Sequence, residues 1–356
     1  MKKYNFSAGP AVLPREVIEK AAASVLNYNN SGFSILEVSH RSKDVVAAMD
    51  QAIALVKELY GLSDEYEVLF LQGGASTQFF QIPMNFLNEE ETAGYINTGA
   101  WSKKAIKDAK AYGKVNVVAS SEEQNFNYIP KNISIPSDLK YLHYTSNNTI
   151  FGTQFQSLPE TDVRLICDMS SDIFSKPIDV SRFDLIYAGA QKNMGPAGVT
   201  LVIVKKSALG TVSRYVPVML DYRTHIENVS MYNTPPVFAM YVSMLTLQWI
   251  KDNGGLEAMA KRNEAKAKIL YDELDRNSLF KGHSVAEDRS LMNVTFTGVS
   301  EEMENEFLDR CKKEGLDGLK GHRSVGGLRA SIYNALEAEG IQKLADLMRA
   351  FEEEKA

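Results

Sequence analysis

Helix-like and strand-like segments alternate from residue 16 to residue 204 of this 356-residue chain. Apolar residues recur at helical spacing over 16–27 and 43–60, and a short apolar run at 66–71 then has the composition of a strand. The rhythm continues through strand-like 92–96, helical 102–112, and strand-like 115–118, 141–144, 163–167, 183–187 and 199–204. Because strand–helix–strand crossovers join parallel strands, this alternation predicts one large α/β domain with a mainly parallel sheet.

The rest of the chain follows a different order. A turn-rich break at 229–236 precedes two helical stretches, 237–251 and 256–277, that are separated by two glycines. A strand (292–296), a helix (301–314), a glycine-rich hairpin-like section and a final helix (341–354) come next. This order predicts a smaller α+β domain at the C-terminal end.

Composition excludes several classes of protein. The formal net charge of -6 provides no positive field for nucleic acid phosphates. Cys167, in an apolar strand, and Cys311, in a charged helical stretch, are not spaced as metal ligands or as a disulfide framework. No apolar run approaches the roughly 20 residues of a membrane span, and the first residues lack a signal-peptide pattern. We therefore expect a cytoplasmic protein that binds no structural metal, nucleic acid or membrane.

Lys192 lies in a turn of small residues, 188–198, between two apolar strand-like runs. A lone lysine is most often a solvated surface charge, but these runs offer no surface for one. In a half-buried site beside apolar or cationic groups, an ammonium with an ordinary pKa near 10.4 can lose its proton and attack a carbonyl. The surroundings of Lys192 therefore favour covalent chemistry with an aldehyde.

Asp168 ends the strand-like run 163–167, at the carboxyl edge where open α/β sheets bind ligands. By itself it could equally be a turn or capping residue. Pyridoxal phosphate enzymes, however, need a lysine for a Schiff base and an acid that keeps the ring nitrogen protonated. At about 4 Å and an effective dielectric constant near 20, that contact is worth about 4 kcal/mol. Together, Lys192 and Asp168 indicate this cofactor.

A small-residue loop, 72–78, follows the strand at 66–71 and precedes a helix. Helix N-terminal amides and the hydroxyls of Ser76 and Thr77 suit a phosphate, although the loop lacks the spacing of a dinucleotide fingerprint or a P-loop. Trp101 follows a strand and begins a helix, so its indole could lie over a flat ring in the same cleft. Simple core packing is the commoner role of a tryptophan.

Cations gather in two short segments. The first segment contains His40 and Arg41, and the second contains His322, Arg323 and Arg329. Each charge-assisted hydrogen bond contributes about 1.5 to 3 kcal/mol, so a few suffice to select a doubly anionic substrate. Any one arginine could be a solvated surface residue, but the glycines around the second segment favour a shaped loop.

Together these features resemble the phosphoserine aminotransferase family, class V pyridoxal-phosphate-dependent aminotransferases with the aspartate aminotransferase fold. The likeness covers essentially the full length and is carried by segments 5–10, 37–42, 189–193, 195–198, 233–236 and 321–334. It implies fold type I, with a mostly parallel seven-stranded sheet in the large domain and a small α+β C-terminal domain. We expect an N-terminal segment (1–15) that packs near the active site, a large domain (16–255) and a small domain (256–356).

The resemblance also implies the cofactor contacts. Pyridoxal 5′-phosphate would be bound covalently to Lys192, with Asp168 at the ring nitrogen, Trp101 stacked on the ring and Thr149 near the ring hydroxyl. Its phosphate would be held by Ala75, Ser76 and Gln191, and by Asn233 and Thr234 of a second subunit. We therefore expect a homodimer with shared active sites.

The substrate contacts follow from the same resemblance. Arg329 would bind the α-carboxylate, and the distal phosphate or side-chain carboxylate would meet His40, Arg41, His322 and Arg323. Many family members carry Gly-Arg where this chain has Ala75-Ser76, which removes a cation. We expect the four distal residues to compensate.

The implied reaction is reversible transfer of the amino group of L-glutamate to 3-phosphohydroxypyruvate, which gives O-phospho-L-serine and 2-oxoglutarate in serine biosynthesis. The sequence does not distinguish this keto acid from the phosphorylated hydroxythreonine precursor of pyridoxine biosynthesis. An alanine–glyoxylate-type aminotransferase is the nearest alternative, and the cationic loops disfavour it. A desulfurase needs a nucleophilic cysteine on a mobile loop, but Cys167 and Cys311 are expected within a strand and a helix. A non-enzymatic scaffold protein is disfavoured because it would have no use for Lys192 and Asp168.

Overall fold

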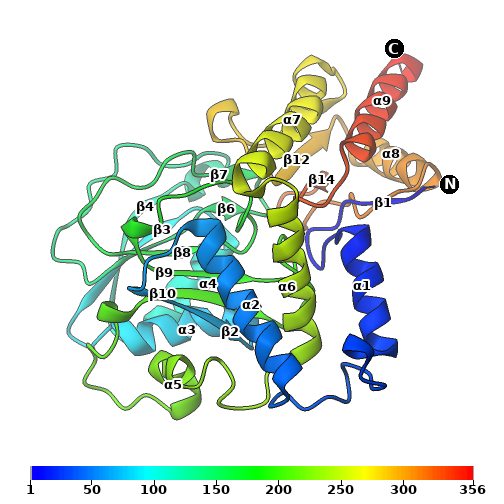
Figure 1. The fold of residues 1–356 in the computed structure, drawn as a ribbon. Helices are drawn as coiled ribbons and strands as arrows, with labels where there is room; N and C mark the ends of the chain where they lie inside the picture. Colours follow the sequence, from blue (N-terminus) through cyan, green and yellow to red (C-terminus); the bar gives the residue numbers. More distant parts are fainter. Residues whose placement is uncertain (1, 356) are drawn as a thin grey trace.

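A seven-stranded sheet forms the centre of the larger part of the molecule (Figure 1). The structure is a computed structural model that describes residues 2–355. The strands lie in the spatial order β2 (Tyr66–Leu71), β10 (Thr200–Lys205), β9 (Phe183–Gly189), β8 (Leu165–Asp168), β5 (Leu142–Thr145), β3 (Thr92–Asn97) and β4 (Lys114–Ser120). Neighbours are parallel except at β10, which is antiparallel to β2 and β9. The mainly parallel seven-stranded sheet is confirmed.

The reversal at β10 explains where Lys192 lies. Residues 190–199 join β9 to β10, and a connection this short cannot contain the crossover that a parallel pair needs. The chain therefore turns back at the carboxyl end of β9. Asp168 ends the neighbouring parallel strand β8 at the same edge, so the two strands bring Asp168 and Lys192 to one side of the sheet.

Helices cover both faces of the sheet. One face packs against α2 (Lys43–Tyr60) and α6 (Val237–Asp252), with α1 (Arg15–Leu26) outside α6; the other packs against α3 (Gly74–Phe86), α4 (Ala100–Ala109) and α5 (Tyr222–Glu227). Side chains alternate between the two cores: Leu201 of β10 packs with the first set of helices, and Val202 packs with the second. Burial on both faces explains why the strands are continuous apolar runs.

The C-terminal part has a core of its own, built on an antiparallel sheet of β11 (Phe280–Gly282), β12 (Asn293–Gly298) and β14 (Leu328–Ser331). Helices α7 (Gly255–Arg276), α8 (Glu301–Lys313) and α9 (Ala338–Lys355) pack around it. The N-terminal strand β1 (Tyr4–Asn5) joins this part by pairing with β13 (Leu316–Asp317). The glycine-rich section between α8 and α9 was expected to be hairpin-like, and only part of it has that structure. Its strands β13 and β14 pair with β1 and β12 respectively, and a single bridge joins Lys320 to Leu328.

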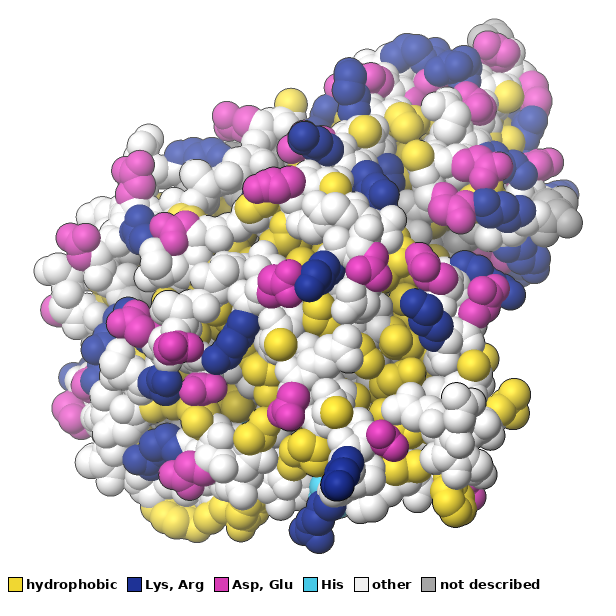
Figure 2. All heavy atoms as spheres, in the orientation of Figure 1, with side chains coloured by type: hydrophobic (Ala, Val, Ile, Leu, Met, Phe, Trp, Pro, Cys, Tyr) yellow, Lys and Arg dark blue, Asp and Glu magenta, His cyan; other side chains and the backbone are white. Residues whose placement is uncertain are grey.

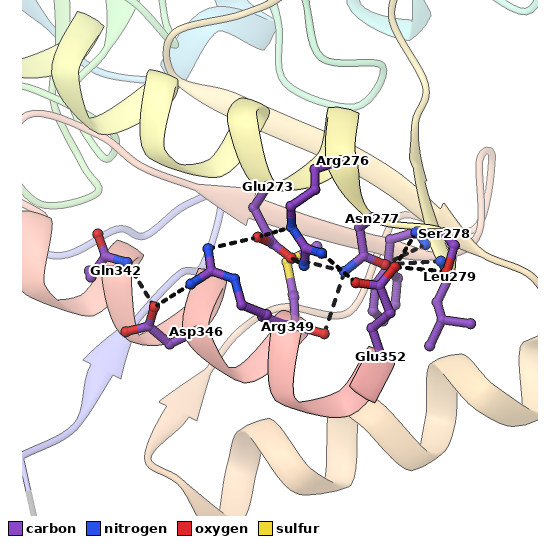
Figure 3. Close-up of polar contacts among 11 residues, drawn as sticks. Glu273, Arg276, Asn277, Ser278, Leu279, Gln342, Asp346, Arg349 and Glu352 are labelled. Atoms are coloured by element: carbon purple, nitrogen blue, oxygen red, sulfur yellow. Dashed lines mark hydrogen bonds and ion pairs between the residues drawn. The ribbon is translucent and has the colours of Figure 1, made fainter. Parts of the chain in front are cut away.

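A polar cluster fixes α7 to α9 (Figure 3). The Glu273 side chain is buried and accepts hydrogen bonds from Arg276 of its own helix and, at 3.1 Å, from Arg349 of α9. Arg276 also donates to Glu352 at 2.7 Å. Burial alone would raise the pKa of Glu273, but the hydrogen bonds from Arg276, Asn277 and Arg349 lower it below its ordinary value. The cluster therefore depends on an ionised Glu273.

The visible face of the molecule is of mixed charge. On the face shown in Figure 2, Lys and Arg side chains are interspersed with Asp and Glu side chains. Across residues 2–355, every helix is too short or too polar to cross a bilayer.

Candidate active site

A cavity of about 400 Å³ opens at the carboxyl edge of the sheet, between the two parts of the chain. This volume suits a small ligand such as a nucleotide-sized cofactor. Its lining includes nine of the residues expected in the site: Ala75, Ser76, Trp101, Thr149, Asp168, Gln191, Lys192, His322 and Arg329. The fold thus gathers residues from loops that are far apart in the sequence.

Lys192 points its ammonium at this cavity. Its Nζ donates a hydrogen bond of 2.9 Å to Thr149 Oγ1 and lies 5.8 Å from the centroid of the Trp101 ring. Burial lowers the pKa of Lys192 to about 8, with Asp168 opposing the shift and Arg329 adding to it. An appreciable fraction of the side chain is therefore a neutral amine at mildly alkaline pH, the form that attacks a carbonyl.

Asp168 is 3% exposed, and its Oδ1 accepts a hydrogen bond from the Ser170 amide at 2.9 Å. Burial raises the pKa of Asp168, and interactions with Ser170, Lys192 and Tyr187 offset only part of that rise. Among the ion pairs of residues 2–355, none joins Asp168 to a cation within 4 Å. A buried carboxyl without a cation favours a ligand that supplies one, which a protonated ring nitrogen does.

The N-terminus of α3 forms another wall. Gly73 adopts φ 94° immediately before the helix, and a Cβ there would lie 1.9 Å from Thr77 Oγ1, so only glycine fits. The first residues of α3 after this turn, including Ala75 and Ser76, line the cavity. Free amides at a helix N-terminus favour a phosphate group. Trp101 also lines the cavity, and its buried Nε1 makes no hydrogen bond within the described chain.

These observations show that the residues present fit pyridoxal phosphate. An amine, a buried acid, an indole ring and a phosphate-binding helix N-terminus line a single cavity. Each matches a different part of that cofactor: the aldehyde, the ring nitrogen, the ring face and the phosphate.

Two side chains that can donate hydrogen bonds to an anion line the same cavity. Arg329 donates to the Thr149 carbonyl at 3.3 Å, and its buried Nε has no partner within residues 2–355. His322 Nδ1 accepts a hydrogen bond of 3.2 Å from the Ser324 amide, which leaves Nε2 as the donor in the neutral ring. Burial lowers the pKa of His322, and Arg329, Arg323 and Lys104 lower it further. Both side chains are thus available to an anion.

The structure does not bring every expected residue to this cavity. Arg41 is exposed and His40 is half-buried in the turn before α2, and Arg323 is exposed beside His322. Asn233 lines a different cavity, with Gln72 and Gly73. The neighbouring Thr234 carbonyl accepts from Gln72 Nε2 at 3.3 Å.

Several lining residues were not anticipated. They are Thr145, Asn147, Ile150, Ser170 and Ser171, whereas the lining residues Ala8, Gly9 and Gly74 belong to segments that the sequence already places near the site. Ser170 and Ser171 could have been inferred, because they follow Asp168 directly. The N-terminal segment that contains Gly9 is held beside Lys192 by a 2.9 Å hydrogen bond from the Ala11 amide to the Gln191 carbonyl.

Comparison with known proteins agrees with the geometry. Residues 3–344 match the family model of the class V aminotransferases, and the chain belongs to this family. It is 58% identical to the phosphoserine aminotransferase of Flavobacterium psychrophilum over 99% of both chains. The structure of the phosphoserine aminotransferase of Bacillus circulans subsp. alkalophilus superposes with a TM-score of 0.97 at 48% identity, covering 100% of this chain and 99% of that one. The pyridoxal-phosphate-bound phosphoserine aminotransferase of Trichomonas vaginalis superposes with a TM-score of 0.93 at 39% identity, covering 98% of this chain and 100% of that one. Fold type I is confirmed, and the chain is an aminotransferase of small molecules whose family implies pyridoxal phosphate as cofactor.

Proposed function

We propose that this chain transfers the amino group of L-glutamate to 3-phosphohydroxypyruvate, giving O-phospho-L-serine and 2-oxoglutarate. The observation that carries the proposal is one cavity with Lys192 and Asp168 on its walls and two anion-binding side chains, Arg329 and His322, also lining it. Full-length identity of 58% to a relative named phosphoserine aminotransferase supports the same substrate pair.

Lys192 has two tasks in this proposal. Its Nζ would hold the cofactor through the aldehyde, and once substrate has displaced it, the free amine would take the proton from the substrate Cα. Pyridoxal phosphate, when bound, supplies an electron-poor ring that stabilises the carbanion left at Cα. The hydrogen bond to Thr149 and the lowered pKa keep the amine positioned and partly unprotonated for both tasks.

The remaining side chains bind and orient. Asp168 would keep the ring nitrogen protonated, Trp101 would cover the ring, and Ala75, Ser76 and Gln191 would hold the cofactor phosphate. Arg329 binds the substrate α-carboxylate, and its unpartnered Nε is free for this role. His322 and Arg323 bind the distal anion, which is a phosphate in one substrate and a carboxylate in the other.

We infer that the active form is a homodimer with shared sites. Asn233, Thr234, His40 and Arg41 do not line the cavity of their own chain, so a second chain must supply them if they serve the site. Large apolar side chains are exposed near both segments: Phe33 and Leu36 before His40, and Tyr215 and Tyr232 before Asn233. Exposed apolar side chains of this kind mark a surface that another chain covers.

Subunit complementation tests the shared site. Lys192→Ala and Arg41→Ala homodimers, each with little activity, are mixed, unfolded and refolded together. In a hybrid dimer, the chain that keeps Lys192 receives Arg41 from its partner, so the mixture should recover about one quarter of wild-type activity by statistical pairing. No recovery would mean that Arg41 serves the site of its own chain, and an active Arg41→Ala homodimer would mean that it serves no site.

A coupled assay tests the reaction. L-glutamate and 3-phosphohydroxypyruvate should yield 2-oxoglutarate and phosphoserine, and the phosphorylated hydroxythreonine precursor is assayed in parallel as a second acceptor. Turnover of glyoxylate with alanine, and of neither phosphorylated acid, would instead support an alanine–glyoxylate-type enzyme.

A further inference from the structure

Lys104 lies on α4, one helical turn after Trp101. Its Nζ is 4.5 Å from the centroid of the Trp101 ring, and Trp101 lines the cavity. Residues at this spacing lie on the same face of a helix, and a cation over an indole is held there by the ring quadrupole. The Lys104 ammonium is therefore held beside the cavity, although the side chain is exposed.

The preceding lysine differs in its partners. Lys103 forms an ion pair with Glu122 and lies over the Phe126 ring, 5.2 Å from its centroid. Its charge is thus neutralised by a carboxylate outside the cavity. Lys103 is therefore paired with a carboxylate outside the cavity, whereas Lys104 is held against Trp101, which lines the cavity.

The cations near Lys104 also lack carboxylate partners. Within residues 2–355, no ion pair joins Lys104, Arg323 or Arg329 to an Asp or Glu. The same three charges all act on His322, which lines the cavity. Several unneutralised cations around one ring repel one another, and an anion of high charge offsets that cost.

We propose that Lys104 is a specificity-determining residue that stabilises the distal phosphate of the substrate by charge attraction, beside His322 and Arg323. It supplies a cation near the pocket in which Ala75 and Ser76 replace the Gly-Arg found in many family members. The inference rests on the proposed function, because it concerns the distal anion of that reaction.

The phosphorylated substrate and glutamate differ in the charge of their distal anion. A phosphate monoester carries close to two negative charges at neutral pH, and the distal carboxylate of glutamate carries one. Coulomb attraction to a single cation doubles with the charge of the anion. If the ammonium and the anion are taken to lie about 7 Å apart in water, removing Lys104 should weaken binding of the carboxylate about threefold and of the phosphate about eightfold.

The test measures KM and kcat for 3-phosphohydroxypyruvate, phosphoserine and L-glutamate with the holoenzyme. Lys104→Gln should raise KM about eightfold for the phosphorylated substrates and about threefold for glutamate, with kcat nearly unchanged. Lys104→Arg should restore the wild-type values. Lys103→Gln, the matched control on the same helix, should match wild type. High salt should shrink the difference, because the interaction is exposed to solvent.

The outcomes separate the two proposals. If the wild-type chain turns over the phosphorylated substrates but Lys104→Gln behaves like Lys103→Gln, the role of Lys104 is refuted and the proposed function stands. Equal KM changes for phosphate and carboxylate substrates, or a fall in kcat alone, would also refute it. If the wild-type chain does not use phosphorylated substrates, both proposals fail together.

Discussion

The Lys192 ammonium donates a 2.9 Å hydrogen bond to the Thr149 hydroxyl, which joins the turn after β9 to the loop after β5. The Thr149 carbonyl accepts from Arg329, so this one residue contacts both the proposed nucleophile and a proposed substrate ligand. The relationship gives Thr149 a role in aligning Lys192 in the unliganded chain.

Thr149→Val removes the hydroxyl and keeps the shape of the side chain. Loss of one hydrogen bond to a charged group corresponds to about 1.5 kcal/mol, so kcat should fall about tenfold. Thr153→Val is the matched control, because Thr153 is equally buried and its hydroxyl makes no hydrogen bond in the described chain. Equal steady-state rates for the two variants would contradict the role of Thr149.

Asp168→Asn removes the acid at the proposed ring-nitrogen position. A contact of about 4 kcal/mol predicts a fall in kcat of roughly a thousandfold, with cofactor still bound. Asp172→Asn is a useful comparison, since Asp172 is buried nearby but bonds to Gln154 at 3.1 Å and does not line the cavity. Single-turnover rates within tenfold of wild type for Asp168→Asn would exclude the assignment.

Arg329→Ala should weaken substrate binding and leave cofactor binding intact. Charge-assisted bonds of about 1.5 to 3 kcal/mol predict a KM raised roughly 10- to 150-fold for both amino donor and acceptor. Absorbance of the bound cofactor, measured on the same samples, separates this effect from loss of the cofactor. A variant that loses its cofactor in parallel with activity would place Arg329 in cofactor binding instead.

Glu273→Gln should destabilise the contact between α7 and α9, because Arg276 and Arg349 lose an ionised hydrogen-bond partner. The loss should be only about 1 to 3 kcal/mol, since both arginines are half-exposed and water can solvate them. Since the pKa of Glu273 is lowered in the folded chain, its contribution is present above the ordinary value of 4.5 and is lost as pH falls through the folded pKa. The difference in urea midpoint between wild type and variant should therefore shrink below about pH 4.5. Asp346→Asn, an exposed partner of Arg349 at 3.8 Å, is the control and should change the midpoint little.

Local patterns were sufficient to predict most elements of the fold. Helix α2 spans Lys43–Tyr60 as expected, because an amphipathic stripe is bounded by the Ser42 cap and by Gly61 in the left-handed conformation. Pairing of very short strands was beyond the sequence: β13 joins β1 through tertiary packing that no local pattern records. The parallel order of the sheet required only the alternation of strands and helices.

Some residues of the candidate site could be predicted from local sequence patterns, and others could not. Asp168 was identifiable because it ends an apolar strand at a known edge of the sheet, and Lys192 because it lies in a turn of small residues between two apolar strands. Lys104 was not, since one exposed lysine resembles another until its distance to Trp101 is known. The placement of His40 and Arg41 away from the cavity of their own chain depends on the arrangement of whole loops and, in our proposal, on a second chain.

Reduction of the holoenzyme with borohydride, followed by peptide mapping, tests the central claim most directly. The account predicts one stable pyridoxyl label per chain, on Lys192, and none in the Lys192→Ala variant. A label on any other lysine, or no label in protein that transaminates at the wild-type rate, would contradict it.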